Sequence, residues 1–180
     1  MQAQLPAERL VFLDESCAKT NMTRLRGRAH QGCRLHDHAP GGQWHTTSMI
    51  GSIRLSGETA CMVIEGATDA ITFREYVRWV LAPTLRPGDI VIADNLGAHH
   101  DSQAREIIEA RGAQMRFLPA YSPDLNPIEA MWSKVKAHLR QAKARTQKSL
   151  LRAIRDALAS VSPSDAQGFF RHAGYVCTIS

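Results

Sequence analysis

Apolar residues occur along this chain either in short continuous runs or at helical intervals, and the short runs come first. Residues 9–16 form a compact apolar run that ends in acids, and the apolar stretches 43–55 and 58–66 are separated by the turn residues Ser56 and Gly57. Short runs of large and β-branched apolar residues, bounded by turn residues, are typical of strands. We therefore expect three strands here, joined as a meander.

Farther along, helical spacing alternates with short runs. In residues 68–85 the apolar positions recur at helical intervals, which predicts a helix capped by Asp69 or Thr68. Residues 86–100 contain a turn, a short strand and an acidic end, residues 102–112 predict a helix closed by Gly112, and residues 113–119 predict another strand. A meander followed by this alternation indicates an α/β sheet of mixed direction.

The last third of the chain is predicted to be helical. Helices are expected over residues 127–144 and 146–161, and a shorter one from Pro163, with Ser162 as N-cap and Asp165 at its third position. The segment 17–43 has no periodicity, which favours an irregular hairpin or a loop. The expected architecture is a single domain over residues 1–180, an α/β fold with a mixed five-stranded sheet flanked by helices.

The composition is that of a soluble globular protein. Of the 180 residues, 44% are hydrophobic and 22% are charged, and the longest apolar run is interrupted by Arg78 and is too short for a membrane span. The start lacks the features of a signal peptide, so we expect a cytoplasmic protein. Four widely separated cysteines favour reduced thiols. The net charge of +5 favours a polyanionic partner, which charge alone does not identify.

Three acids stand where elements end or begin. Asp14 lies on the first strand, Asp94 at the carboxyl end of the fourth, and Glu129 at the start of the helix after the fifth. Singly, each has an ordinary explanation: a strand-end turn for Asp14, an Asx-turn for Asp94, and for Glu129 a capping box with Asn126 as N-cap and Pro127 after it.

Together, the three acids point to a cation. Strands rarely deliver several uncompensated carboxylates to one place unless a positive group collects them. Hard divalent cations such as Mg²⁺ take oxygen ligands, and a pair about 3.5–4 Å apart can activate an attacking oxygen and stabilise a leaving one in a displacement at phosphorus. The acids therefore predict metal-assisted phosphoryl chemistry.

The stretches VFLDES, IVIADNLGAHH and LPAYSPDLNPIEAMWSKVK resemble the DDE transposases of the mariner superfamily, specifically the bacterial insertion-sequence-630 branch. The resemblance extends over residues 9–160 and includes the thirty-four residues between Asp94 and Glu129, a spacing typical of that branch. It implies a ribonuclease H-like fold in which Asp14, Asp94 and Glu129 are catalytic and bind two Mg²⁺ ions, for which Mn²⁺ can substitute.

The resemblance also implies a reaction and partners. Activated water would cut a DNA phosphodiester and free a 3′-hydroxyl, which would then attack target DNA, with a TA dinucleotide as the expected target. The expected partners are transposon ends and target DNA, and the expected assembly on DNA is a homodimer. Such a protein would be associated with the nucleoid.

Residues beside the three acids have open roles. Asn95, His99, His100 and Asn126 are candidates to support the site from behind. Either histidine could orient a water or contact a phosphate, or could pack at a helix start. Glu15 should point to the opposite face of its strand, away from the acids.

Several other candidates are better explained by structure. Asp124 lies in the turn before Glu129, where turn chemistry accounts for it. Trp132 and Trp44 are more typical of packing than of base stacking. A zinc site is conceivable in the loop, but the spacing lacks two ligand pairs and a solvated loop is favoured; its members are Cys33, His36, His38 and His45.

A basic stripe follows Glu129 at helical steps through Lys136, Arg140 and Lys143. Basic helix faces are usually solvated. Beside a site that must hold a DNA backbone, however, we expect these three residues to contact phosphates.

The first strand begins about ten residues from Met1, ahead of which transposases of this kind carry helix-turn-helix modules. We expect that module to be absent from this chain, because a separately encoded subunit supplies it or because the chain is a truncated remnant. Two rival functions stay open: a stand-alone ribonuclease H-like nuclease, which cuts without joining, and an inactive DNA-binding remnant, against which the intact acids argue.

Overall fold

A mixed five-stranded sheet forms the centre of the structure, a computed structural model that describes residues 5–38, 40–41 and 44–177. The strand order is β3-β2-β1-β4-β5. β1 is antiparallel to β2 and β2 to β3, whereas β4 runs parallel to β1 and β5 parallel to β4. The strands are β1 (Leu10–Lys19), β2 (Thr46–Arg54), β3 (Thr59–Glu65), β4 (Ile90–Ala93) and β5 (Gln114–Phe117). The predicted meander and the mixed α/β class are confirmed.

The first strand is longer than predicted. β1 continues to Lys19, past the expected end at residue 16, because its second half pairs with the first half of β2 as far as Lys19 opposite Thr46. The added residues are Cys17, Ala18 and Lys19, which are too few to show an apolar period, so the sequence pattern could not reveal the extension. Gln43, the expected first residue of the second strand, lies outside the described residues.

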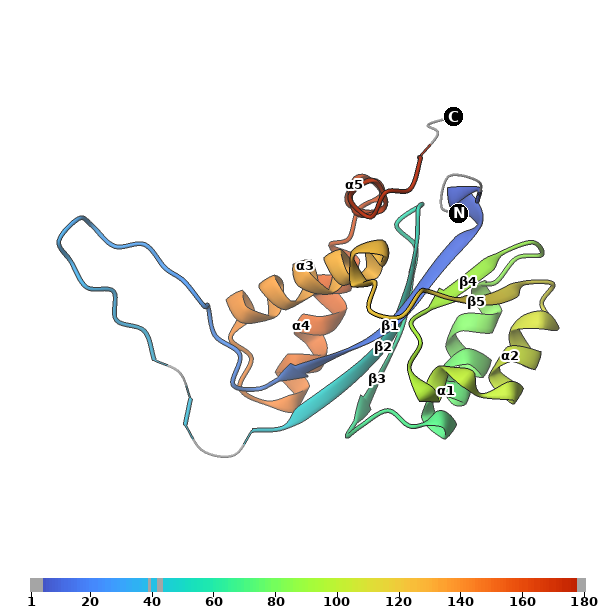
Figure 1. The fold of residues 1–180 in the computed structure, drawn as a ribbon. Coiled ribbons are helices and arrows are strands. Elements are labelled where there is room, and N and C mark those ends of the chain that lie inside the picture. Colours follow the sequence, from blue (N-terminus) through green and yellow to red (C-terminus); the bar gives the residue numbers. More distant parts are fainter. Residues whose placement is uncertain (1–4, 39, 42–43, 178–180) are drawn as a thin grey trace.

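Helices cover both faces of the sheet (Figure 1). α1 (Ala70–Tyr76) and α2 (Ser102–Glu109) lie on one face, and α3 (Pro127–Ala142), α4 (Gln147–Ala159) and α5 (Pro163–His172) lie on the other. Asp69 caps α1 by accepting from the Thr72 N–H at 2.8 Å. Ser162 and Asp165 form the predicted capping box of α5.

The predicted helix over residues 68–85 is only partly α-helical. After Tyr76 the backbone continues as a π-helical turn, Val77–Leu81, and then as a short 3-10 turn, Ala82–Thr84. Pro83 lies in that last turn and has no N–H to donate, so a regular helix cannot continue through it.

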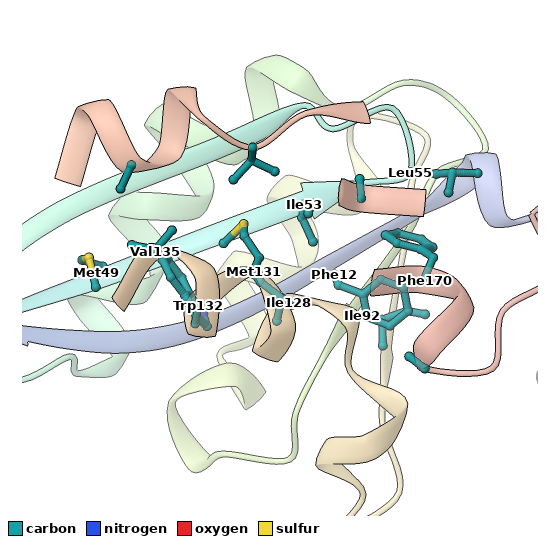
Figure 2. Close-up of a cluster of buried hydrophobic side chains, with 14 of the residues drawn as sticks. Phe12, Met49, Ile53, Leu55, Ile92, Ile128, Met131, Trp132, Val135 and Phe170 are labelled. Atoms are coloured by element: carbon teal, nitrogen blue, oxygen red, sulfur yellow. The ribbon is translucent and has the colours of Figure 1, made fainter. Parts of the chain in front are cut away.

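The side chains of the central strands alternate between two cores. On β1, Leu10 and Phe12 face the core beneath α3, α4 and α5, and Val11 and Leu13 face the core beneath α1 and α2. Figure 2 shows the first core, in which Trp132 of α3 and Phe170 of α5 lie against residues of the sheet. Within the described chain, no helix is long and apolar enough to cross a membrane.

The described residues between β1 and β2 form a long arm that projects from the sheet near the carboxyl end of α3 (Figure 1). A turn closes its tip, where the Cys33 N–H donates to the His30 carbonyl at 2.9 Å. Lys143 contacts Asp37 on the returning limb, with Nζ 2.9 Å from Oδ2. No strand forms among the described residues 20–45, so beyond the end of β1 the segment is a long loop, one of the two forms predicted for it.

Candidate active site

An open cavity of about 410 Å³ collects all three predicted acids, Asp14, Asp94 and Glu129. β4 ends at Ala93 and runs parallel to its neighbour β1. Asp14 of β1 therefore lies near Asp94, the residue that follows β4. Asp14 shares the face of Leu10 and Phe12, which is the face covered by α3. The sheet therefore presents two aspartates to the first turn of α3, where Glu129 lies.

The start of α3 positions Glu129 without a capping box. Asn126 occupies the N-cap position and Pro127 follows it, as predicted, and the Glu129 N–H donates to the Asn126 carbonyl at 3.2 Å. The Asn126 side chain, however, caps no backbone N–H, and its Oδ1 is buried without a hydrogen-bond partner. The capping-box alternative for Glu129 is therefore wrong, and its side chain is exposed at the cavity.

Asp14 is the most buried of the three acids, with 8% of its surface exposed. Burial raises the pKa of its carboxyl group to about 7, and repulsion from Glu129 and Asp94 adds to the rise. The Glu15 N–H donates to Asp14 Oδ1 at 2.8 Å and opposes that rise in pKa. A carboxylate in these surroundings is stabilised when a cation enters the cavity.

His99 links Asp94 to the opposite face of the sheet. Its Nδ1 is 2.7 Å from Asp94 Oδ1, and its Nε2 is 3.0 Å from both carboxylate oxygens of Glu15. Burial alone lowers the pKa of His99, but the hydrogen bonds to Asp94 and Glu15 raise it to about 10. A charged imidazole ring thus lies between two carboxylates, and its hydrogen bond lowers the pKa of Asp94.

This arrangement decides several open roles. His99 is fully buried and packs beside Phe73, with ring centroids 4.6 Å apart, so it holds Asp94 from behind. Glu15 points away from the cavity, as predicted. His100 contacts Asn95 Oδ1 at 2.7 Å through Nε2 and stacks on Phe117. The Glu15–His99 contact was not predicted, because 84 positions separate the two residues and no local pattern joins them.

Other candidates lie elsewhere. Asp124 is exposed in the 3-10 turn Pro123–Leu125 and lines a neighbouring hollow, not the cavity of the three acids. Trp132 is buried as predicted, but Trp44 is 48% exposed, because it lies before β2 where no helix covers it, with Lys19 Nζ 5.8 Å from its ring centroid. Cys33 is exposed near the tip of the arm.

The ligand atoms at the cavity suit a hard cation, although they do not form a complete ligand shell. Oxygen is the only ligand type that the three acids offer, and the unpaired Asn126 Oδ1 adds an acceptor in a residue that lines the same cavity. Among the described residues, no three His, Cys, Asp or Glu side chains are arranged closely enough to hold a metal ion as they stand. Asp94 turns toward His99 and Asp14 accepts from the backbone, so further oxygens would have to complete a ligand shell.

The three residues of the predicted basic stripe have different surroundings along α3. Lys136 and Arg140 are half-buried. Arg140 lines an open groove together with Arg24 and Arg26 of the arm, so three guanidinium groups border one groove. Lys143 ends α3 in a left-handed conformation and is paired with Asp37.

Comparison with known proteins identifies a family. Residues 9–151 match the family described as DDE superfamily endonuclease. Among curated proteins there is no match. The structure of the Mos1 strand transfer complex aligns with a TM-score of 0.67 and 18% identity over 92% of this chain and 51% of that chain. The Mos1 mariner paired end complex with Mn gives 0.67 and 18% over 91% and 52%, and the catalytic domain of Mos1 mariner transposase gives 0.58 and 16% over 92% and 76%.

These likenesses concern the fold. The chain spans about half the length of the first two structures. The predicted ribonuclease H-like architecture, a mixed five-stranded sheet flanked by helices, agrees with them. The similar structures include the Mos1 transposase paired-end complex with the left transposon end and the Mos1 paired end complexes with Mn and with Mg.

Proposed function

The chain belongs to the DDE superfamily of endonucleases, and we propose that it is the catalytic domain of a transposase that cuts DNA and joins the cut strand to target DNA. One observation carries the proposal: Asp14, Asp94 and Glu129 reach a single open cavity from three different elements. The likeness to Mos1 transposase complexes supports it.

Asp14, Asp94 and Glu129 would hold divalent metal ions, Mg²⁺ or Mn²⁺. When bound, such ions stabilise negative charge at the reacting phosphorus and lower the pKa of the attacking water. The chain's own residues hold the geometry. Asp14 is fixed by the Glu15 N–H, and His99 fixes the Asp94 side chain through one carboxylate oxygen, while Glu15 anchors His99 from the other side of the sheet.

The reaction would proceed in two displacements at phosphorus. Water adds to a phosphodiester as the bond to the 3′ oxygen breaks, which leaves a 3′-hydroxyl and a 5′-phosphate. The freed 3′-hydroxyl then attacks a phosphodiester of the target and displaces a new 3′-hydroxyl. Each carboxylate keeps its place in both steps, so one cavity serves for cutting and joining.

The finer assignment is to the insertion-sequence-630 branch, with a TA target. The thirty-four residues between Asp94 and Glu129 support it. A homodimer assembled on DNA and a separately encoded helix-turn-helix subunit for recognising transposon ends complete the proposal. Lys136, Arg140 and Lys143 would contact phosphates, and the groove that Arg140 shares with two arginines of the arm supports this for Arg140.

A joining assay tests the function. The purified chain is incubated in Mg²⁺ with a short duplex that ends in a 3′-hydroxyl and with a supercoiled plasmid as target. A transposase covalently joins the duplex to the plasmid, and sequencing of the junctions should return TA. Nicked plasmid without joined product would identify a nuclease instead, and an intact plasmid would identify an inactive remnant.

A further inference from the structure

Apolar side chains line the outer part of the cavity, next to the acids. Leu96 is 49% exposed and Tyr121 is 102% exposed, and both line the cavity that holds Asp14, Asp94 and Glu129. Among the described residues that line this cavity, none is a lysine or an arginine. The lip therefore has no charge with which to bind a phosphate, and it offers a flat ring and an aliphatic side chain.

Tyr121 is held in a backbone conformation that tyrosine disfavours. Its φ is 58°, in the left-handed region where turns usually place Gly or Asn. The other described non-glycine residue with positive φ, Lys143, ends helix α3 and donates its N–H to Leu139, so a helix terminus accounts for it. Tyr121 precedes the single 3-10 turn Pro123–Leu125 and ends no helix.

The free protein gains little from this tyrosine. A fully exposed ring buries no apolar surface, and the left-handed backbone of a residue with a Cβ costs free energy. Unfavourable backbone conformations that persist in a fold are concentrated at sites that bind or react. An exposed ring at the edge of a cavity of acids is therefore best explained by a ligand that covers it.

We infer that Tyr121, together with Leu96, forms a stacking site for an unpaired nucleobase next to the phosphate that the three acids act on. This inference rests on the proposed function, because it needs DNA at the cavity. Every base has a flat π-face that stacks on an aromatic ring without regard to sequence. The three acids would thus act on the phosphate inside the cavity, and Tyr121 and Leu96 would contact the base at the edge of the cavity.

Binding of a fluorescent oligonucleotide tests the inference. The probe is a short single strand that contains one 2-aminopurine, whose fluorescence falls when the base stacks, and it is titrated with Tyr121→Phe, Tyr121→Ala, Tyr121→Gly and the wild type. Phe should bind and quench as the wild type does. Ala and Gly should bind about 5- to 150-fold more weakly, without quenching.

The two small substitutions separate stacking from loop structure. Glycine adopts φ 58° without steric cost, so Tyr121→Gly keeps the loop and loses the ring. Restored binding in the Gly variant would show that loop conformation matters and would overturn the inference. Trp79→Ala is the matched control, because Trp79 is 69% exposed on the helical segment that follows α1, on the opposite face of the sheet; it should bind the probe as the wild type does.

Two further results would also overturn the inference. If Tyr121→Ala binds and quenches the probe as the wild type does, a stacking site is excluded. If that variant also sediments differently from the wild type in the absence of DNA, the Tyr121 ring contacts another protein chain instead of a base. Metal-dependent cleavage of plasmid by the wild type is measured in parallel. If the wild type cleaves while Tyr121→Ala binds normally, the stacking site fails and the proposed function stands; if the wild type does not cleave, the proposed function fails.

Discussion

The contact between Gly51 and Trp132 fixes the height of α3 above the sheet. Gly51 lies directly opposite Asp14 in the β1–β2 pair, and a Cβ at Gly51 would lie 2.8 Å from Trp132 Cη2 and 3.0 Å from Cζ2. Ordinary contact begins at 3.4 Å, so the indole would have to move by about 0.6 Å. Trp132 is 1% exposed and lies one turn after Glu129, so its movement would displace α3 and Glu129 together.

Gly51→Ala should therefore destabilise the fold and weaken the site. Overpacking of a core costs about 1–3 kcal/mol, which in a chain of this size lowers the melting temperature by roughly 2–4 °C for each kcal/mol. Urea unfolding measures the loss of free energy, and cleavage of plasmid in Mg²⁺ measures the loss of activity. Both should fall, because Glu129 would be displaced from Asp14.

A second substitution tests the cause. Trp132→Phe removes the ring atoms that a Cβ at Gly51 would meet, and it also removes the buried Nε1, which has no hydrogen-bond partner. The double variant should be less destabilised than the sum of the two single variants, with a coupling of about 0.5–3 kcal/mol. Additive losses of free energy, or a Gly51→Ala variant as stable as the wild type, would refute this reasoning.

Three further outcomes are expected. Asp165→Asn should lower the free energy of unfolding by about 1 kcal/mol at neutral pH, because it removes the ion pair with Lys134 and weakens the capping box with Ser162. The hydrogen bonds from Lys134 and Ser162 lower the pKa of Asp165 in the fold, so the wild type should lose this advantage as pH falls below about 4, and an acid titration by circular dichroism checks it. Arg54→Met should cost about 3–5 kcal/mol in urea unfolding because it leaves Asp89 buried and unpaired, and adding Asp89→Asn should recover part of the loss. Lys136→Ala with Arg140→Ala should reduce the salt dependence of log K for DNA by about one unit per lost contact with little change in melting temperature, whereas an unchanged slope and affinity would make the stripe a solvated face.

Local patterns predicted most of the elements of the fold. Apolar runs located the five strands, and helical spacing located α2, α3 and α4, because burial on one face is written in the order of residues. Capping residues were equally local, and Ser162 with Asp165 begins α5 as predicted. Departures occurred where a neighbour or a special residue decided the outcome, as for the β1 extension paired with β2 and the π-helical turn after Tyr76.

The acids of the site were predictable, but their supports were not. Asp14, Asp94 and Glu129 stand at ends of elements that a parallel sheet and a following helix bring together, and the cavity contains all three. His99 joins Asp94 at the cavity to Glu15 on the opposite face of the sheet, and the approach of Trp132 to Gly51 depends on how α3 packs. Such contacts depend on the packing of distant segments, which periodicity does not encode.

Cleavage by variants of the three acids tests the central claim most directly. Supercoiled plasmid is incubated in Mg²⁺ with the wild type, Asp14→Asn, Asp94→Asn or Glu129→Gln, with circular dichroism as a check on folding and EDTA as a check on metal dependence. Asp124→Asn is the matched control, since that exposed acid lies outside the cavity. The account predicts nicking by the wild type and the control in Mg²⁺, none in EDTA, and none by the three folded variants, because an amide is a poor ligand that cannot balance the charge of the ion. Near-wild-type nicking by any of the three would contradict the claim.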